Sequence, residues 1–225
     1  ELGDIDALYQ RRLQTLQALD DLIESVVTAL EDTGQLENTY IIYTSDNGYH
    51  MGEHRLRPSK NTPYEEDIRV PFVIRGPGIM PGTRLDALTL NIDLAPTFAA
   101  MAGVQPPDFV DGRSLLPQLQ GKTPPTWRSS FLLQKQKSTP SQAEEEDTSA
   151  TPLSFLGLRT INYTYVEWNN GEKELYDLRK DPYQLQNIAS QADPTLLQEF
   201  SHHLQELSQC KAEDCRRIEN KPLTP

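Results

Sequence analysis

The stretch Tyr40-Ile41-Ile42-Tyr43-Thr44 is built of β-branched and aromatic residues without polar alternation. Such a run is typical of a strand that is buried on both faces of a parallel sheet. Parallel sheets are covered by helices on their faces, so the stretch favours an α/β fold.

Further elements are predicted on both sides of this strand. Apolar residues recur every three or four positions over residues 5–30, which is the spacing of a helix that buries one stripe, and Gly34 ends it. A second strand is expected over residues 70–75. A third, over residues 85–92, should lead into a short helix with Asp93 at its N-cap. The α/β class therefore rests on a helix followed by several strands.

The sequence is predicted to divide at about residue 125. Residues 1–125 are expected to form one domain and residues 126–225 a smaller one. The second contains a stretch at about 135–152 that is rich in Ser, Thr, Pro, Gln and Glu, and we expect a disordered surface insertion there. Asn170-Gly171 marks a hairpin turn. The elements predicted in the second domain are strands over 127–133, 156–160, 163–168 and 172–178 and a helix over 196–207.

Composition excludes several classes of partner. The formal net charge is −12, and lysines and arginines are scattered along the sequence. A nucleic-acid or anionic membrane surface needs clustered positive charge, so we expect neither as a partner. No run of about 18 apolar residues occurs, so no membrane-spanning segment is predicted.

Two cysteines, Cys210 and Cys215, lie close together near the C-terminal end. In an oxidising compartment they would close a small disulfide loop, and in the cytosol they would be two thiols. A zinc site is less favoured, because two cysteines are too few and His202 and His203 are the only nearby imidazoles. We expect the disulfide.

Oxygen-bearing side chains follow the first predicted strand directly. Asp46 and Asn47 stand at its carboxyl end, where α/β sheets gather their ligands, and Gly48 allows a sharp turn. Carboxylate and amide oxygens suit Ca²⁺ or Mg²⁺. Taken alone, Asp-Asn-Gly is also a common plain turn, and Lys60 alone is a typical surface lysine.

The longer string over residues 40–78, YIIYTSDNGYHMGEHRLRPSKNTPYEEDIRVPFVIRGPG, resembles the sulfatase family, in particular its arylsulfatase and glucosamine-sulfatase branch within the alkaline-phosphatase-like group. The strand, the Asp46-Asn47 pair, Lys60 and the Arg69-Val70-Pro71 segment occur in the family's order. Residues 175–183, LYDLRKDPY, are similar to the family's C-terminal subdomain.

This resemblance implies an α/β, alkaline-phosphatase-like sulfatase fold that is incomplete in this chain. Residues 1–125 would be the C-terminal portion of the catalytic domain. Residues 126–225 would be a small C-terminal subdomain of antiparallel sheet and helix.

The resemblance also implies roles for four residues. Asp46 and Asn47 would bind a divalent cation, Ca²⁺ or another such as Mg²⁺, and Lys60 would contact the sulfate. His50 would contact the ester oxygen and help the leaving group depart. These roles agree with the chemistry, because a cation and a fixed ammonium both stabilise negative charge that builds up on sulfate oxygens.

The family's nucleophile is missing from the sequence. It is a formylglycine made from the first residue of a C/S-x-P-S-R motif, and neither cysteine lies in such a motif. Residues 138–142, STPSQ, lack the arginine. Asp20-Asp21 imitates the family's other aspartate pair but lies inside the predicted helix. We therefore expect the nucleophile and the remaining ligands in a missing N-terminal half of the same enzyme, and this chain alone to be inactive.

The predicted function is hydrolysis of a sulfate ester by a sulfuric ester hydrolase. A phosphodiesterase or phosphonate hydrolase of the same superfamily is the alternative, and Asn47, where many of those relatives carry His, favours sulfate. A catalytically inactive sulfatase fragment is the third hypothesis. We expect export to a periplasmic, secreted or lysosome-like location, with a signal that is not in this chain.

Overall fold

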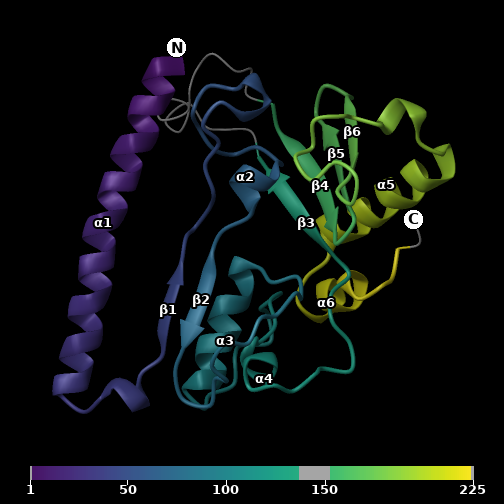
Figure 1. Ribbon diagram of the computed structural model, residues 1–225. Coiled ribbons are helices and arrows are strands. Elements are labelled where there is room, and N and C mark those ends of the chain that lie inside the picture. Colours follow the sequence, from purple (N-terminus) through teal and green to yellow (C-terminus); the bar gives the residue numbers. More distant parts are fainter. Residues whose placement is uncertain (1, 137–152, 224–225) are drawn as a thin grey trace. The chain divides into compact units, whose positions relative to one another are not determined.

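The computed structural model describes residues 2–136 and 153–223. The chain separates into two compact units (Figure 1), one formed by Glu1–Lys60 and Glu66–Pro81 and the other by Asn61–Glu65 and Gly82–Pro225. These units divide at other points than residue 125, where the domain boundary stays a prediction. Most of the predicted insertion, residues 137–152, lies outside the described residues.

The long helix of the first unit is α1 (Leu2–Asp32), which confirms the predicted helix. It ends before Gly34, whose φ of 66° is readily adopted only by glycine. The prediction that α1 buries its apolar stripe is wrong for the described residues, since they cover little of this helix. Its exposed large apolar residues are Tyr9, Leu13, Leu16, Leu22, Ile23 and Val26.

The strand predicted first is β1 (Ile41–Thr44), which follows a short 3-10 helix, η1 (Leu36–Asn38). It pairs with β2 (Phe72–Arg75), and the ladder is antiparallel, with Ile42 opposite Ile74. The strand positions are confirmed, but the parallel pairing and the burial on both faces are wrong for the described residues. Residue type reports how readily a strand can be buried, and it does not report the direction of its neighbour.

The second unit contains a four-stranded antiparallel sheet in the order β3 (Ser130–Lys135), β4 (Phe155–Thr160), β5 (Tyr163–Trp168) and β6 (Lys173–Asp177). The three strands predicted after the insertion are confirmed. The turn between β5 and β6 contains Gly171 at φ 90°, as the Asn-Gly signal predicted. β3 begins three residues later than the strand expected at residue 127.

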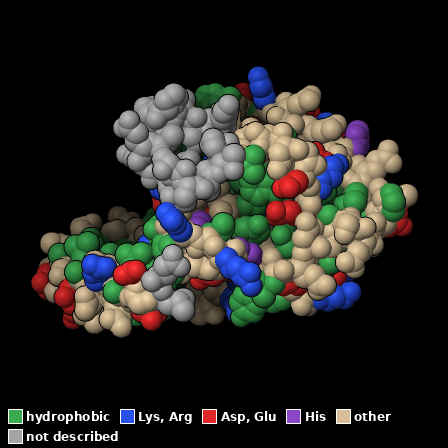
Figure 2. All heavy atoms as spheres, turned by 90° about the horizontal axis from the view of Figure 1, so that it is seen from above, with side chains coloured by type: hydrophobic (Ala, Val, Ile, Leu, Met, Phe, Trp, Pro, Cys, Tyr) green, Lys and Arg blue, Asp and Glu red, His purple; other side chains and the backbone are tan. Residues whose placement is uncertain are grey.

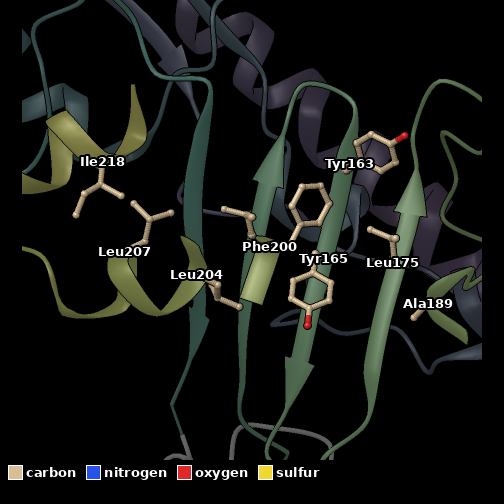
Figure 3. Close-up of a cluster of buried hydrophobic side chains, with 9 residues drawn as sticks. Tyr163, Tyr165, Leu175, Ala189, Phe200, Leu204, Leu207 and Ile218 are labelled. Carbon is tan, nitrogen blue, oxygen red and sulfur yellow. The ribbon is translucent and has the colours of Figure 1, made fainter. Parts of the chain in front are cut away.

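One face of this sheet packs against α5 (Pro194–Gln209), which confirms the predicted helix. Asp193 caps the helix, because its side chain accepts a hydrogen bond from the Thr195 amide. Figure 3 shows Phe200 and Leu204 of α5 among the strand side chains Tyr165 and Leu175. Each of these large side chains contributes about 1.5–3 kcal/mol by burial, so the sheet and α5 form the core of the unit.

The strand predicted over residues 85–92 is absent from the described structure. There the Leu88 carbonyl accepts a hydrogen bond from the Trp127 indole at 2.8 Å, and the Leu90 amide donates to Asp93 at 2.9 Å. Side chains therefore satisfy the backbone groups that a strand would pair. A 3-10 helix, η3 (Asn91–Asp93), leads into α3 (Leu94–Met101), followed by α4 (Leu116–Leu119).

Asp93 stands at the N-cap of α3 as predicted, but its side chain makes no capping bond. It is fully buried and accepts hydrogen bonds from the guanidinium of Arg128, which is also fully buried. Arg128 donates in addition to Glu219 at 3.0 Å, and Arg113 donates to the same carboxylate at 2.6 Å. Two arginines and two carboxylates thus form one buried ionic network.

Glu219 belongs to the last helix, α6 (Glu213–Glu219). The predicted disulfide between Cys210 and Cys215 is confirmed, and it joins the end of α5 to α6. A further 3-10 helix, η4 (Ala189–Gln191), precedes α5. The bridge removes both cysteines from thiol or zinc chemistry.

The surface offers no concentrated positive charge on the face drawn in Figure 2, where lysine and arginine side chains are dispersed among acidic and uncharged ones. Among the described residues, no helix is both long and apolar enough to span a bilayer.

Candidate active-site loop

The predicted metal pair lies at the carboxyl end of β1, as expected. The Asp46 carboxylate accepts a hydrogen bond from the Asn47 amide at 2.7 Å, and Asp46 is exposed. The side-chain nitrogen of Asn47 donates to the Gly48 carbonyl at 2.6 Å. A carboxamide binds cations through its oxygen, so the side-chain oxygen of Asn47 is the atom suited to a cation.

Gly48 lies against α2 (Glu65–Ile68), a single helical turn. Its amide donates to the Asp67 carbonyl, and the Tyr49 amide donates to the Glu66 carbonyl, both at 2.8 Å. A Cβ atom at Gly48 would lie 1.9 Å from the Glu66 carbonyl oxygen. Only glycine allows this close approach, so the turn seen in the sequence has a packing reason rather than a dihedral one.

His50 and Ser59 form an isolated antiparallel bridge that closes the loop between them. Each amide donates to the other residue's carbonyl, at 3.0 and 3.1 Å. Lys60 comes directly after Ser59, and its side chain is exposed. The bridge therefore brings the chain carrying Lys60 beside the chain that continues from the Asp46-Asn47 pair.

The His50 side chain is buried and faces Asp67. Its Nδ1 lies 3.0 Å from each carboxylate oxygen of Asp67, and the two side chains are only 3% and 2% exposed. Burial alone lowers the pKa of His50, but the hydrogen bond to Asp67, the charge of Asp67 and a hydrogen bond with the Arg57 backbone raise the pKa above its ordinary value. The contact with Asp67 therefore makes His50 easier to protonate than a free histidine.

The remainder of the loop is a tight and strained turn. It contains the 3-10 segment η2 (Glu53–Arg55), in which His54 and Arg55 have φ of 55° and 58°. Non-glycine residues seldom adopt such values, and they persist where surrounding contacts impose them. Elsewhere in the loop, the Arg12 guanidinium of α1 lies 4.4 Å from the centre of the Tyr49 ring.

The structure thus gathers all four predicted residues in one loop of the first unit. Asp46 and Asn47 stand at its start and Lys60 at its end, and His50 joins the two arms. The sequence reasoning missed Asp67. A third acidic residue after Glu65-Glu66 carries no local signal for burial, because its partner is far away in the sequence.

The donor chemistry of Asp46 and Asn47 fits part of a cation site. Ca²⁺ takes six to eight oxygen ligands, whereas these two residues supply fewer. Across residues 2–136 and 153–223, no cluster of three or more His, Cys, Asp or Glu is placed to hold a metal ion. Asp20 and Asp21 are exposed on α1 and add no ligand there.

The chain also lacks a precursor for formylglycine. Both of its cysteines are joined in the Cys210–Cys215 disulfide. The STPSQ segment at residues 138–142, which lacks the arginine of the motif, lies outside the described residues. The residues present therefore do not fit the nucleophile of the resembled family.

Comparison with known proteins places this loop in a family. The sequence model of the family described as Sulfatase matches residues 3–104, which include the whole loop. Human N-acetylglucosamine-6-sulfatase is 39% identical over 235 aligned residues, which cover 94% of this chain and 43% of that protein.

Solved structures are similar as well. One protein in complex with its substrate D-glucosamine-2-N,6-O-disulfate has a TM-score of 0.76 and 32% identity, covering 92% of this chain and 41% of that one. The phosphonate monoester hydrolase of Agrobacterium radiobacter has a TM-score of 0.70 and 30% identity, covering 84% and 38%. The chain thus spans less than half the length of these relatives.

Proposed function

This chain belongs to the sulfatase family, and from that premise we propose that it is part of a sulfuric ester hydrolase. One observation carries the proposal: a single loop, closed by the His50–Ser59 bridge, holds Asp46 and Asn47 on one arm and Lys60 on the other. Hard oxygen donors and a lysine in one loop suit a tetrahedral oxyanion such as a sulfate ester.

Each of these residues has a distinct role in the proposal. Asp46 and Asn47 contribute oxygen ligands to a divalent cation, Ca²⁺ by preference. When bound, such a cation withdraws charge from the sulfate oxygens. The exposed Lys60 ammonium binds a sulfate oxygen and offsets the negative charge that grows there in the transition state. For His50, burial of the ring favours a supporting role over the predicted contact with the ester oxygen.

The substrate class we propose is a sulfated amino sugar. Human N-acetylglucosamine-6-sulfatase and the structure bound to D-glucosamine-2-N,6-O-disulfate support this choice. The net charge of −12 disfavours long polyanions and nucleic acids, so a small sulfated saccharide is the better fit.

The rest of the catalytic machinery belongs, in this proposal, to further sequence of the same enzyme. The relatives are more than twice as long as the aligned region, which leaves room for a formylglycine and the remaining cation ligands. Export to an oxidising compartment is supported by the Cys210–Cys215 disulfide, because such bridges persist there.

The test uses the full-length protein and three substrates: an aryl sulfate, N-acetylglucosamine 6-sulfate and a phenylphosphonate ester. We expect sulfate release from the first two. Lys60→Ala should lower kcat/KM on both by about 10²–10³-fold, the usual cost of removing one oxyanion donor. Lys122→Ala, an exposed lysine of the second unit, is the matched control and should change nothing.

The phosphonate ester tests the second candidate function, which the Agrobacterium radiobacter structure favours. A higher kcat/KM on this ester than on either sulfate would make the protein a phosphonate hydrolase. Full activity of Lys60→Ala would show that Lys60 does not contact the sulfate in the reaction. No activity on any substrate, from protein shown to carry formylglycine and metal, would favour the inactive form.

A further inference from the structure

We propose that Asp67 is a positioning residue: through His50 it holds the Asp46-Asn47 arm and the Lys60 arm of the loop in register, and His50 itself does not touch the substrate. The inference rests on the proposed function, since it concerns the same loop.

The first support is the geometry of the buried pair. Counted over the whole residue, His50 is 2% exposed and Asp67 4% exposed. The Nδ1 atom of the imidazole is equidistant from both carboxylate oxygens of Asp67. A buried carboxylate is tolerated only where it is paired and hydrogen-bonded, so loss of either side chain removes a charged partner from the other in a buried place. The pair therefore fixes the position of His50 relative to α2.

The second support is the backbone around His50. The two hydrogen bonds with Ser59 tie the second arm of the loop to His50. The amides of Gly48 and Tyr49 are bonded to carbonyls of α2, one of which belongs to Asp67 itself. Two sets of contacts thus meet at His50, the side-chain pair with Asp67 and the backbone bridge to Ser59, and a third fixes the two residues before it. His50 lies three positions after Asn47, and its bridge partner Ser59 directly precedes Lys60.

The third support concerns what His50 cannot do. A general acid must come within hydrogen-bond reach of the leaving oxygen. The His50 side chain is only 3% exposed, and its Nδ1 lies 3.0 Å from each carboxylate oxygen of Asp67. These contacts hold the ring inside the loop, away from a ligand at its surface.

A second buried histidine provides a matched control. His203 is 3% exposed, and its Nε2 lies 2.9 Å from the Ser130 hydroxyl in the core of the second unit. A change there removes an equally buried imidazole and one side-chain hydrogen bond, but it leaves the loop untouched. It separates positioning from a general loss of stability.

The experiment compares His50→Gln, Asp67→Asn, the double variant and His203→Gln in the full-length protein. Kinetics are measured on aryl sulfates whose leaving groups span a range of pKa, and hydrogen exchange is followed over residues 45–60. We expect each single loop variant to lower kcat by about 10–10²-fold, the usual effect of removing a supporting partner, with little change in KM. The loss should be equal for all leaving groups.

The double variant should lose no more than either single one, because both break the same contact. Both single variants should speed exchange over residues 46–50 and 59–60. The control should lower the melting temperature and leave kcat and loop exchange as they are.

Three results would overturn the inference. A His50→Gln loss that grows with leaving-group pKa would make His50 a proton donor, and additive losses in the double variant would separate Asp67 from His50. Unchanged hydrogen exchange over the loop in Asp67→Asn would show that Asp67 does not position it. Failure of the proposed function is distinguishable: the wild type would then release no sulfate, while loop exchange in the variants would still decide the role of Asp67.

Discussion

Gly48→Ala is the substitution that the loop should tolerate least. The added Cβ would lie 1.9 Å from the Glu66 carbonyl oxygen and 2.8 Å from its carbon. Both are backbone atoms of α2, so no side-chain rotation relieves the clash. The arm carrying Asp46 and Asn47 must move away from α2 instead.

The size of the effect follows from the contacts that this movement breaks. Two backbone hydrogen bonds, from the amides at 48 and 49, contribute about 1 kcal/mol each. The His50–Asp67 contact involves charged groups and contributes about 1.5–3 kcal/mol if it is lost too. We therefore expect docking of the loop to weaken by about 2–5 kcal/mol, which raises its opening constant by about 30- to 4 × 10³-fold.

Hydrogen exchange measured by mass spectrometry on the full-length protein checks this number. Amides at positions 48 and 49 should exchange faster by the same factor as the opening constant. Gly3→Ala is the matched control, because a Cβ there meets nothing within 4 Å and Gly3 lies in α1. Exchange at positions 48 and 49 within threefold of wild type would refute the reasoning.

Three further predictions concern stability, measured by thermal and urea unfolding. The pKa of buried His50 is raised, so its stabilisation is full below the unfolded-state pKa of about 6.5 and is lost as pH rises through the folded-state value. Burial lowers the pKa of His203, so the stability that this histidine contributes is present above the unfolded-state pKa of about 6.5 and is lost as pH falls. His50→Gln and His203→Gln should therefore remove pH dependences of opposite sign. Parallel pH profiles of the two variants would contradict this. Cys215→Ser opens a short disulfide loop and should cost about 2 kcal/mol in oxidised protein, with no difference from wild type after reduction. Arg128→Ala removes the guanidinium that Asp93 and Glu219 share and should cost about 3–5 kcal/mol, so a loss below 1 kcal/mol would show that the network contributes little.

The elements that the sequence predicted well are those with local signals. The three-or-four spacing located α1, and the Asn-Gly turn located the β5–β6 hairpin. Both patterns depend on neighbours within a few residues, so tertiary contacts had little to override. The cysteine pair was equally local, and its predicted bridge is present.

The features that failed depend on distant residues. Residues 85–92 look like a strand, but Trp127 and Asp93 hydrogen-bond to their backbone in place of a second strand. The direction of β2 relative to β1 and the exposure of α1 likewise depend on what lies beside them. The residue types of a segment do not reveal which other segment packs beside it.

The candidate site divides in the same way. Asp46, Asn47 and Lys60 follow from the order of motifs along the chain, and the structure brings their arms together through the His50–Ser59 bridge. The pairing of His50 with Asp67 could not be foreseen, because an acidic residue beside two others resembles a solvated helix start. Burial decides its role, and burial is a property of the folded chain.

The order of strands in the β3–β6 sheet follows their order in the chain, and this has a consequence for the folding kinetics. Each strand pairs with its neighbour in sequence, and the turn between β4 and β5, residues 161–162, is the shortest of these connections. Closing a short turn costs little chain entropy, so we expect this hairpin to form first, within about 1–10 μs. The slower steps then fall to contacts between remote segments, such as Arg128 with Glu219, which close only after the sheet exists.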